Sequence, residues 1–324
     1  MRLVVMRFVL VLAGLLLFPN ICPAPWIYTP GEGWHYEWPG GEGAWRRRTA
    51  PEQLAMAQQA FDKKDYSLAA KAARRVVSTW PFSTNAPPAQ YLVARSYEAK
   101  GQDERAFKAY QRLIEKYPKV DNYDEIVKRQ FAIANRFLGG QWFKLWNVVP
   151  AFPSMDKTVG LYEKIIKNGP YSEVAPQAQL NIGEAHEKKL IADYPAAVKA
   201  YETAADRYSD EKAGIDGLYK VGLTYTREAR RAEYDQGVAS QAIATFSDFA
   251  TLYPDDPRVP ETLKLSSGLK TEQARGSFDI ARFYEKSHHW QAARIYYNDV
   301  LDKDPNSKFA DVARQRIIGI KKRE

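Results

Sequence analysis

The chain has 324 residues, enough for two ordinary domains or for one stacked array of repeats. Its 47 basic and 39 acidic residues give a net charge of +8, and no basic stripe alternates with stacking aromatic residues, so we expect no nucleic-acid partner. Cys22 is the only cysteine, which excludes an internal disulfide bond.

The first 24 residues have the pattern of an export signal. Arg2 and Arg7 precede an uninterrupted apolar run at residues 8–18. This run is shorter than the roughly 20 apolar residues that span a bilayer, and an uncleaved membrane anchor is the competing interpretation. Cys22 stands where a bacterial lipoprotein carries its acylated cysteine, whereas a cut after Ala24 would remove this residue. The sequence leaves both alternatives open.

Residues 25–50 form a leader that is rich in glycine, proline and tryptophan. Glycine and proline at this density forbid a regular helix. The leader is either a flexible linker or a segment whose tryptophans dock on the first repeat or on a partner, because each indole offers a large apolar contact area.

Six spaced small and large positions recur in the same register in two parts of the chain. In residues 275–305 they are Ala281, Tyr284, Ala293, Tyr297, Val300 and Pro305, and in residues 88–118 they are Ala94, Tyr97, Ala106, Tyr110, Leu113 and Pro118. Two antiparallel helices approach closely only where the facing residues are small, so we expect the alanines at the helix crossing and the large residues beside it. The spacing predicts the helix pair of a tetratricopeptide repeat (TPR).

Extended along the chain, this register predicts an all-α fold, a TPR-type α-solenoid in the form of a right-handed superhelix over residues 51–324. About six helix pairs are expected near residues 51–86, 87–120, 124–172, 175–209, 214–256 and 274–306, with an extra helical stretch at residues 260–274. Residues 307–321 are expected to be a capping helix with an apolar stripe of Phe309, Val312, Ala313, Ile317 and Ile320.

The third helix pair is interrupted after Phe137 by an insertion at residues 139–156, the most apolar loop of the chain. Trp142, Phe143 and Trp146 lie in this insertion. They either fold back over the third repeat or present a patch to a partner or a bilayer surface.

Three short stretches carry a likeness beyond the generic repeat. Residues 80–83 (Trp-Pro-Phe-Ser) close the first repeat, and residues 253–260 (Tyr-Pro-Asp-Asp-Pro-Arg-Val-Pro) lead into residues 281–284 (Ala-Arg-Phe-Tyr) of the sixth. With the long insertion and the export signal followed by a cysteine, they resemble the BamD (ComL) family of bacterial outer-membrane assembly lipoproteins.

The resemblance implies a non-enzymatic protein of the cell envelope, at the periplasmic face of the outer membrane. Members of that family bind the β-barrel insertase BamA and help to deliver unfolded outer-membrane proteins, and a lipid anchor would hold the chain at the membrane. The N-terminal repeats would receive the terminal segment of the substrate and the C-terminal repeats would face the insertase. The alternative is a generic periplasmic TPR scaffold for envelope, pilus or division machinery.

The first helix of each TPR pair lines the groove of the array, which defines the candidate partner-binding residues. Two positions on the first helix, counted from the small residue of each repeat, define these candidates. The first position holds an aromatic residue and the second holds the residue that flanks it. The pairs are Tyr91 and Arg95, Phe131 and Asn135, Tyr219 and Leu223, and Phe278 and Arg282. Such a row suits an extended, aromatic-rich peptide. The competing interpretation is that the rings pack between neighbouring repeats.

Signals for catalysis are absent from the sequence. We find no nucleophile elbow, no phosphate-binding glycine motif and no His-Glu-x-x-His zinc motif, so we expect no catalytic residues and no cofactor. His288 and His289 are adjacent, so their side chains diverge, and His186 occupies a large packing position; no metal site is expected.

Overall fold

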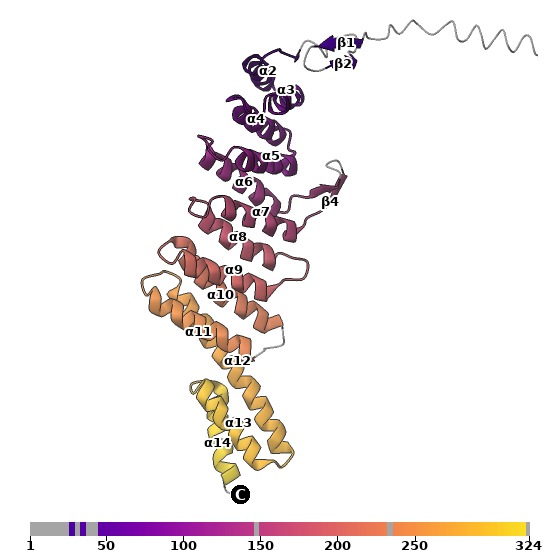
Figure 1. The fold of residues 1–324 in the computed structure, drawn as a ribbon. Helices are drawn as coiled ribbons and strands as arrows, with labels where there is room; N and C mark the ends of the chain where they lie inside the picture. The colour runs from indigo at the N-terminus through magenta and orange to yellow at the C-terminus, as the bar shows by residue number, and fades with distance from the viewer. Residues whose placement is uncertain (1–25, 30–32, 37–44, 146–148, 232–235, 322–324) are drawn as a thin grey trace, which may run out of the picture. The chain divides into compact units, whose positions relative to one another are not determined.

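A computed structural model describes the chain except for residues 1–25, 30–32, 37–44, 146–148, 232–235 and 322–324 (Figure 1). The chain divides into two compact units, residues 1–120 and residues 121–324, which are described separately below. Cys22 and Trp146 lie outside the described residues.

The N-terminal unit contains a small hairpin followed by two helix pairs. The elements are β1 (Trp26–Thr29), β2 (Gly33–Tyr36), α2 (Ala50–Asp62), α3 (Tyr66–Thr79), α4 (Ala86–Ala99) and α5 (Asp103–Lys116). The two strands pair antiparallel, with Trp26 opposite Tyr36. Sequence reasoning excluded a helix in this leader but did not foresee its strands, although aromatic and β-branched residues favour them.

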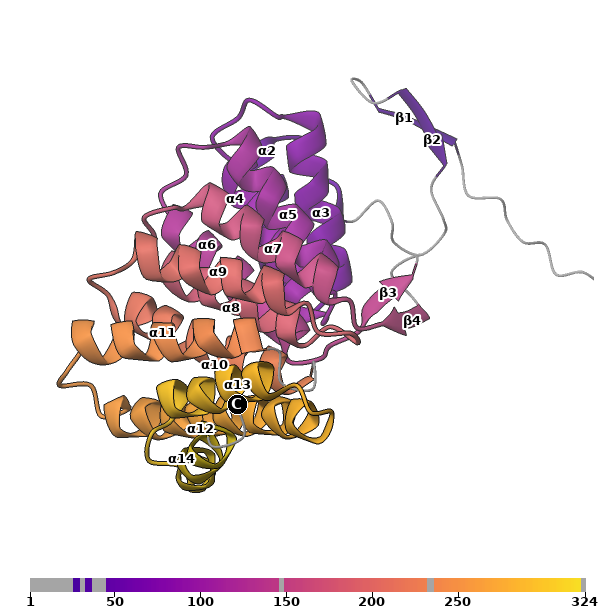
Figure 2. The same ribbon diagram turned by 90° about the horizontal axis from the view of Figure 1, so that it is seen from below.

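The C-terminal unit contains a stack of helices and a second hairpin. Its elements are α6 (Tyr123–Leu138), β3 (Phe143–Leu145), β4 (Val149–Phe152), α7 (Met155–Asn168), α8 (Ala175–Glu187), α9 (Tyr194–Arg207), α10 (Lys212–Arg231), α11 (Gln236–Leu252), α12 (Val259–Lys286), α13 (Trp290–Lys303) and α14 (Lys308–Lys321). From α6 to α14 each helix packs against the next, as Figures 1 and 2 show. The predicted TPR-type α-solenoid is confirmed.

Small residues on first helices face large rings on second helices, as the repeat spacing predicts. Ala281, Ala293 and Tyr297 are fully buried in one cluster, and Ala94, Ala106 and Tyr110 are fully buried at the corresponding positions. In α8 and α10 the small residue is glycine. A Cβ added to Gly183 would lie 2.4 Å from the Tyr201 ring, and one added to Gly222 would lie 2.5 Å from the Phe246 ring. Glycine is therefore required where the ring of the partner helix touches the backbone.

The turn inside three of the helix pairs uses a left-handed residue. The backbone φ is 63° at Lys64, 64° at Gly101 and 59° at His288, each the second residue after the first helix of its pair. A left-handed residue at this place ends a helix and lets the chain reverse. Glycine adopts this conformation without strain, whereas the lysine and the histidine carry a small conformational cost.

The C-terminal region departs from the sequence prediction in two places. The expected extra stretch at residues 260–274 is continuous with the next helix, because α12 runs over 28 residues from Val259. Buried side chains along its length, such as Leu269, Ala274 and Ala281, hold it against its neighbours. In α14, Ala313 and Ile320 are buried as expected, but Val312 is 39% exposed and lies off the buried stripe. No helix within the described ranges is long and apolar enough to cross a membrane.

Candidate functional site

The four aromatic residues predicted to line a groove are half-buried on first helices. Each ring packs against a buried ring on the second helix of its own pair. The centroid distances are 6.0 Å for Tyr91–Tyr110, 6.0 Å for Phe131–Tyr162, 5.6 Å for Tyr219–Phe249 and 5.6 Å for Phe278–Tyr297. Phe278 also lies 5.6 Å from Phe309 of α14. Each ring therefore has both a packing role and a partly exposed surface.

A pocket of about 420 Å³ lies between α2 and α4 in the N-terminal unit. Its lining contains the predicted pair Tyr91 and Arg95, and the full set is Pro51, Leu54, Ala55, Gln58, Phe61, Asn85, Pro88, Tyr91, Leu92 and Arg95. Most of these side chains are apolar, two are amides, and Arg95 is the only charged one. The pocket therefore suits an apolar segment that carries a single negative charge.

Arg95 is held at this pocket by two aromatic rings. Its guanidinium carbon lies 5.7 Å from the Phe61 centroid and 5.8 Å from the Tyr91 centroid, and Nη1 donates to the Tyr91 hydroxyl at 3.2 Å. Among the described residues no carboxylate pairs with this cation. The rings fix the guanidinium, and its remaining N–H groups can donate to a carboxylate ligand.

The α2 residues of the pocket were not predicted from the sequence, because the candidate positions were counted only from the second repeat onward. Leu54 and Gln58 stand at the same spacing around Ala57 as Tyr91 and Arg95 do around Ala94. The same count applied to the first repeat would have identified both residues.

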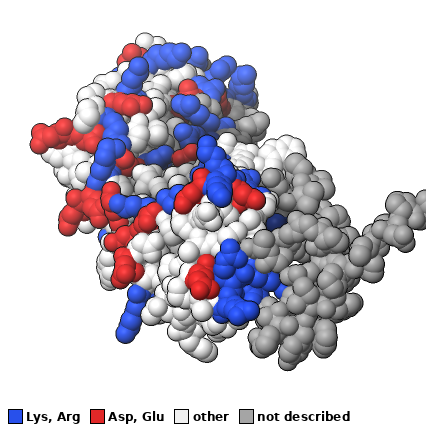
Figure 3. All heavy atoms as spheres, turned by 90° about the horizontal axis from the view of Figure 1, so that it is seen from above, with Lys and Arg blue, Asp and Glu red and all other residues white. Residues whose placement is uncertain are grey.

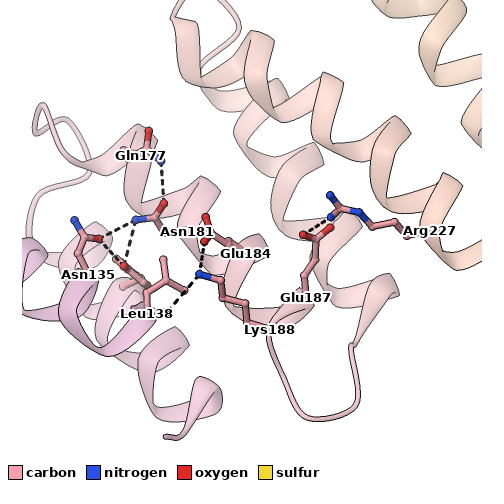
Figure 4. A network of polar contacts seen from close by, with 9 residues as sticks. Asn135, Leu138, Gln177, Asn181, Glu184, Glu187, Lys188 and Arg227 are labelled. Carbon is pink, nitrogen blue, oxygen red and sulfur yellow. Dashed lines mark hydrogen bonds and ion pairs between the residues drawn. The ribbon is translucent and has the colours of Figure 1, made fainter. Parts of the chain in front are cut away.

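A polar network joins α6, α7 and α8 in the C-terminal unit (Figure 4). The Tyr162 hydroxyl donates to Asn135 Oδ1 at 2.6 Å, and Asn181 Nδ2 donates to the same oxygen at 2.9 Å. Gln177 Nε2 donates to Asn181 Oδ1 at 2.8 Å. Asn135 is exposed, and its Nδ2 has no partner among the described residues. The predicted residue Asn135 thus offers an amide donor that its neighbours hold in one orientation.

Ion pairs extend the same surface from α8 to α10. Lys188 Nζ lies 2.7 Å from Glu184 Oε1, and Arg227 Nη1 lies 2.7 Å from Glu187 Oε2 (Figure 4). The Thr224 hydroxyl also donates to Glu187. The Glu187 contacts connect α8 to α10, whereas the Lys188–Glu184 pair lies at the end of α8.

The predicted residue Tyr219 is locked by an arginine that sequence reasoning did not single out. The Arg258 guanidinium lies 4.7 Å from the Tyr219 centroid, donates to Asp216 at 2.7 Å and makes two side-chain bonds of 2.9 and 2.8 Å to Asp256. Bonding to Arg258 lowers the pKa of Asp256 to about 2, so this carboxylate stays ionised at neutral pH. Tyr219 therefore serves mainly in packing within the array and less as a contact for a binding partner.

The last two predicted positions differ in exposure. Leu223 is half-buried and packs against a core cluster that includes Ala242 and Phe246. Arg282, by contrast, is exposed on α12, next to the 65% exposed ring of Phe283. Of the eight predicted positions, Asn135 and Arg282 are the exposed ones.

Trp142 and Phe143 of the insertion have different environments. Phe143 is 2% exposed and stacks on Phe137 with a centroid distance of 4.0 Å and an interplanar angle of 10°. Lys157 Nζ lies 5.0 Å from the Phe143 centroid. Trp142 is 52% exposed. One ring therefore folds back on the third repeat while its neighbour faces solvent.

No group of His, Cys, Asp and Glu side chains suited to a metal ion occurs in the described part of the chain. His186 is largely buried, and its pKa is lowered mainly by burial. The site therefore consists of apolar surfaces, amides and ion pairs, which are features of binding surfaces.

Two family models match the sequence. Residues 154–313 match the family described as outer membrane lipoprotein (YfiO), and residues 88–119 match a tetratricopeptide repeat. The second match coincides with the repeat predicted at residues 88–118. No curated protein matches the chain.

Several solved structures are similar to this chain. A TPR protein from Parabacteroides merdae is 10% identical, with a TM-score of 0.33 over 84% of this chain and 98% of that chain. TTC0263, a TPR protein of Thermus thermophilus, is 13% identical, with a TM-score of 0.29 over 67% and 98%. MamA from Desulfovibrio magneticus is 13% identical, with a TM-score of 0.32 over 64% and 97%.

Proposed function

We propose that this chain, whose residues 154–313 match the family described as outer membrane lipoprotein and whose residues 88–119 match a tetratricopeptide repeat, is a BamD-like, non-enzymatic adaptor of outer-membrane β-barrel assembly. It binds the terminal segment of an unfolded barrel protein through its N-terminal repeats and a BamA-type insertase through its C-terminal repeats. The family agrees with a location in the cell envelope.

The pocket between α2 and α4 is the observation that carries the proposal. A barrel protein ends in a strand with alternating apolar residues, and a chain end carries one carboxylate. The lining of Leu54, Phe61 and Tyr91 supplies apolar surface for the last side chains, and Arg95 supplies the only cation. Because Arg95 already lies against two rings, little side-chain entropy is lost when it binds the carboxylate.

The amide surface of the C-terminal unit supports the binding of extended chain. Asn135 and Asn181 are oriented by Tyr162 and Gln177, so Asn135 can donate to a carbonyl of an unpaired strand without reorganising. Unfolded barrel segments have many unsatisfied backbone groups, which makes a fixed amide donor a suitable contact that does not depend on sequence.

The insertase contact is assigned to the last repeat. Ile280, Arg282 and Phe283 are exposed on α12, and Ile295 is exposed on α13. Exposed aromatic and aliphatic side chains with an arginine are typical of the centre of a protein interface.

Affinity purification from detergent-solubilised envelopes tests the adaptor function. We expect a tagged chain to recover the BamA-type insertase, and the paired change Arg282→Glu with Phe283→Ser to lose it. The control change Lys199→Gln on α9 should leave recovery intact. Recovery of other envelope machinery without the insertase would contradict the proposal and favour a general scaffold.

A further inference from the structure

A basic face, defined here by Arg46, Arg47, Arg48, Lys71, Arg74 and Arg75, covers one side of the first repeat. Residues 45–80 contain eight Lys and Arg residues and three Asp and Glu residues, so this short region carries five of the eight net positive charges of the chain. Figure 3 shows several groups of Lys and Arg side chains on the face turned toward the viewer, with Asp and Glu side chains among them. The charge excess is thus concentrated and not spread along the array.

Buried groups connect the arginine run before α2 to the basic residues of α3. Gln53 is fully buried in α2, where its Nε2 donates to the carbonyls of Trp45 at 3.2 Å and Ala72 at 3.4 Å. Its Oε1 accepts from the Arg47 backbone N–H at 2.7 Å. The Trp45 ring lies 5.6 Å from the Arg46 guanidinium carbon and 4.9 Å from Lys71 Nζ. The arginine run before α2 is therefore fixed against α3.

The second helix of the first pair differs in charge from the other second helices. Helix α3 contains Lys71, Arg74 and Arg75 and no acidic residue, and Lys71 and Arg74 are exposed. By contrast, α9 has two basic and two acidic residues, and so does α13. A solvent-exposed helix face does not require an excess of basic residues, because a mixture of acidic and basic residues solvates it equally well.

We propose that this basic face binds the anionic headgroups of a phospholipid membrane and orients the N-terminal unit on it. Only 26 residues separate the apolar run at residues 8–18 from Trp45, a length that spans at most roughly 90 Å. An uncleaved apolar run or a lipid on Cys22 would keep this end of the chain close to a membrane. Lys and Arg clusters near such a surface are attracted by the negative potential of anionic lipids.

The basic face is poorly suited to binding an acidic protein. Protein interfaces depend on a central apolar anchor, and none of the described residues from 45 to 81 is an exposed large hydrophobic residue. A charged bilayer needs no such anchor. The inference does not depend on the proposed peptide pocket, which lies on the α2 and α4 side of the unit.

Lysine footprinting by mass spectrometry tests the proposal with the full chain in lipid nanodiscs. We expect acetylation of Lys71 to slow about fivefold when phosphatidylcholine discs receive about a third of phosphatidylglycerol, and Lys108 of α5 to serve as the unaffected reference. Salt raised to about 0.5 M, where the screening length is only about 4 Å, should restore the rate.

Two double variants that each remove two positive charges separate the effect of position from the effect of net charge. The change Arg48→Gln with Arg74→Gln should abolish the protection of Lys71, whereas Arg112→Gln with Lys116→Gln on α5 should preserve it. Equal protection in both kinds of disc, or protection that survives high salt, would overturn the proposal. Protection by soluble RNA or by inorganic phosphate in neutral discs would also overturn it, because the face would then be a general polyanion site.

Discussion

Replacing Tyr297 by alanine is expected to lower the local stability of α12 to α14 by about 3–5 kcal/mol, the largest effect that we predict for a single substitution. Tyr297 is fully buried in the cluster that joins these three helices, with the Phe278 ring 5.6 Å away. The loss of the ring leaves a cavity at the point where α13 contacts both neighbours. Hydrogen exchange of the α13 amides measures this change, because it reports opening of the last repeats without unfolding the rest.

Two control variants distinguish the contribution of the Tyr297 ring to stability from that of its hydroxyl and from that of the adjacent Tyr296. The Tyr297 hydroxyl donates to Glu285 at 2.6 Å, so Tyr297→Phe should cost only about 1 kcal/mol. The adjacent Tyr296 is half-buried and stacks on Tyr284 at 5.5 Å, so Tyr296→Ala should cost less than Tyr297→Ala. Equal effects of Tyr296→Ala and Tyr297→Ala would contradict the repeat register.

Replacing Arg95 by glutamine is expected to weaken the binding of a carboxyl-terminal barrel peptide by roughly 10- to 100-fold, as for the loss of a charge-assisted hydrogen bond at a fixed cation. The reason is that Arg95 is the only charge in the pocket between α2 and α4 and is oriented by Phe61 and Tyr91. Fluorescence anisotropy with a labelled peptide that ends in an aromatic residue and a free carboxylate measures this loss.

The same peptide with an amidated end provides the matched control. The wild-type chain should bind the amidated peptide more weakly, and Arg95→Gln should cause little further loss, because the charge partner is already absent. If the substitution weakened both peptides equally, Arg95 would act through the packing of the pocket and not through the carboxylate.

The repeat spacing was sufficient to predict the fold because it reports a local packing requirement. Ala281 and Ala293 can occupy the helix crossing only if a ring such as Tyr297 fills the space beside them, and the same relation recurs at Ala94, Ala106 and Tyr110. The junction before the sixth pair was harder to predict. The continuity of α12 depends on burial along residues 259–274, which a repeat template does not describe.

The candidate site could be predicted only in part, because its residues have two roles. Position in the repeat predicts Tyr91, Arg95 and Asn135 as contacts for a partner, but it does not indicate how much of each side chain is exposed. Tyr219 was expected to contact a partner, yet Arg258 covers its face from the next repeat. That contact joins residues about forty positions apart, and nothing in the local sequence of α10 indicates it. The exposed Trp142 and the buried Phe143 are likewise neighbours in sequence that only the fold distinguishes.

Site-specific photo-crosslinking in intact cells tests the central claim most directly, with the photoreactive residue placed at Gln58 in the pocket between α2 and α4. Position 112 on α5 is the control, because Arg112 is exposed and does not line the pocket. Position 58 should capture unfolded outer-membrane barrel proteins through their terminal segments, and position 112 should not. Equal capture at both positions, or no capture of barrel proteins at position 58, would contradict the binding of substrate ends at this pocket.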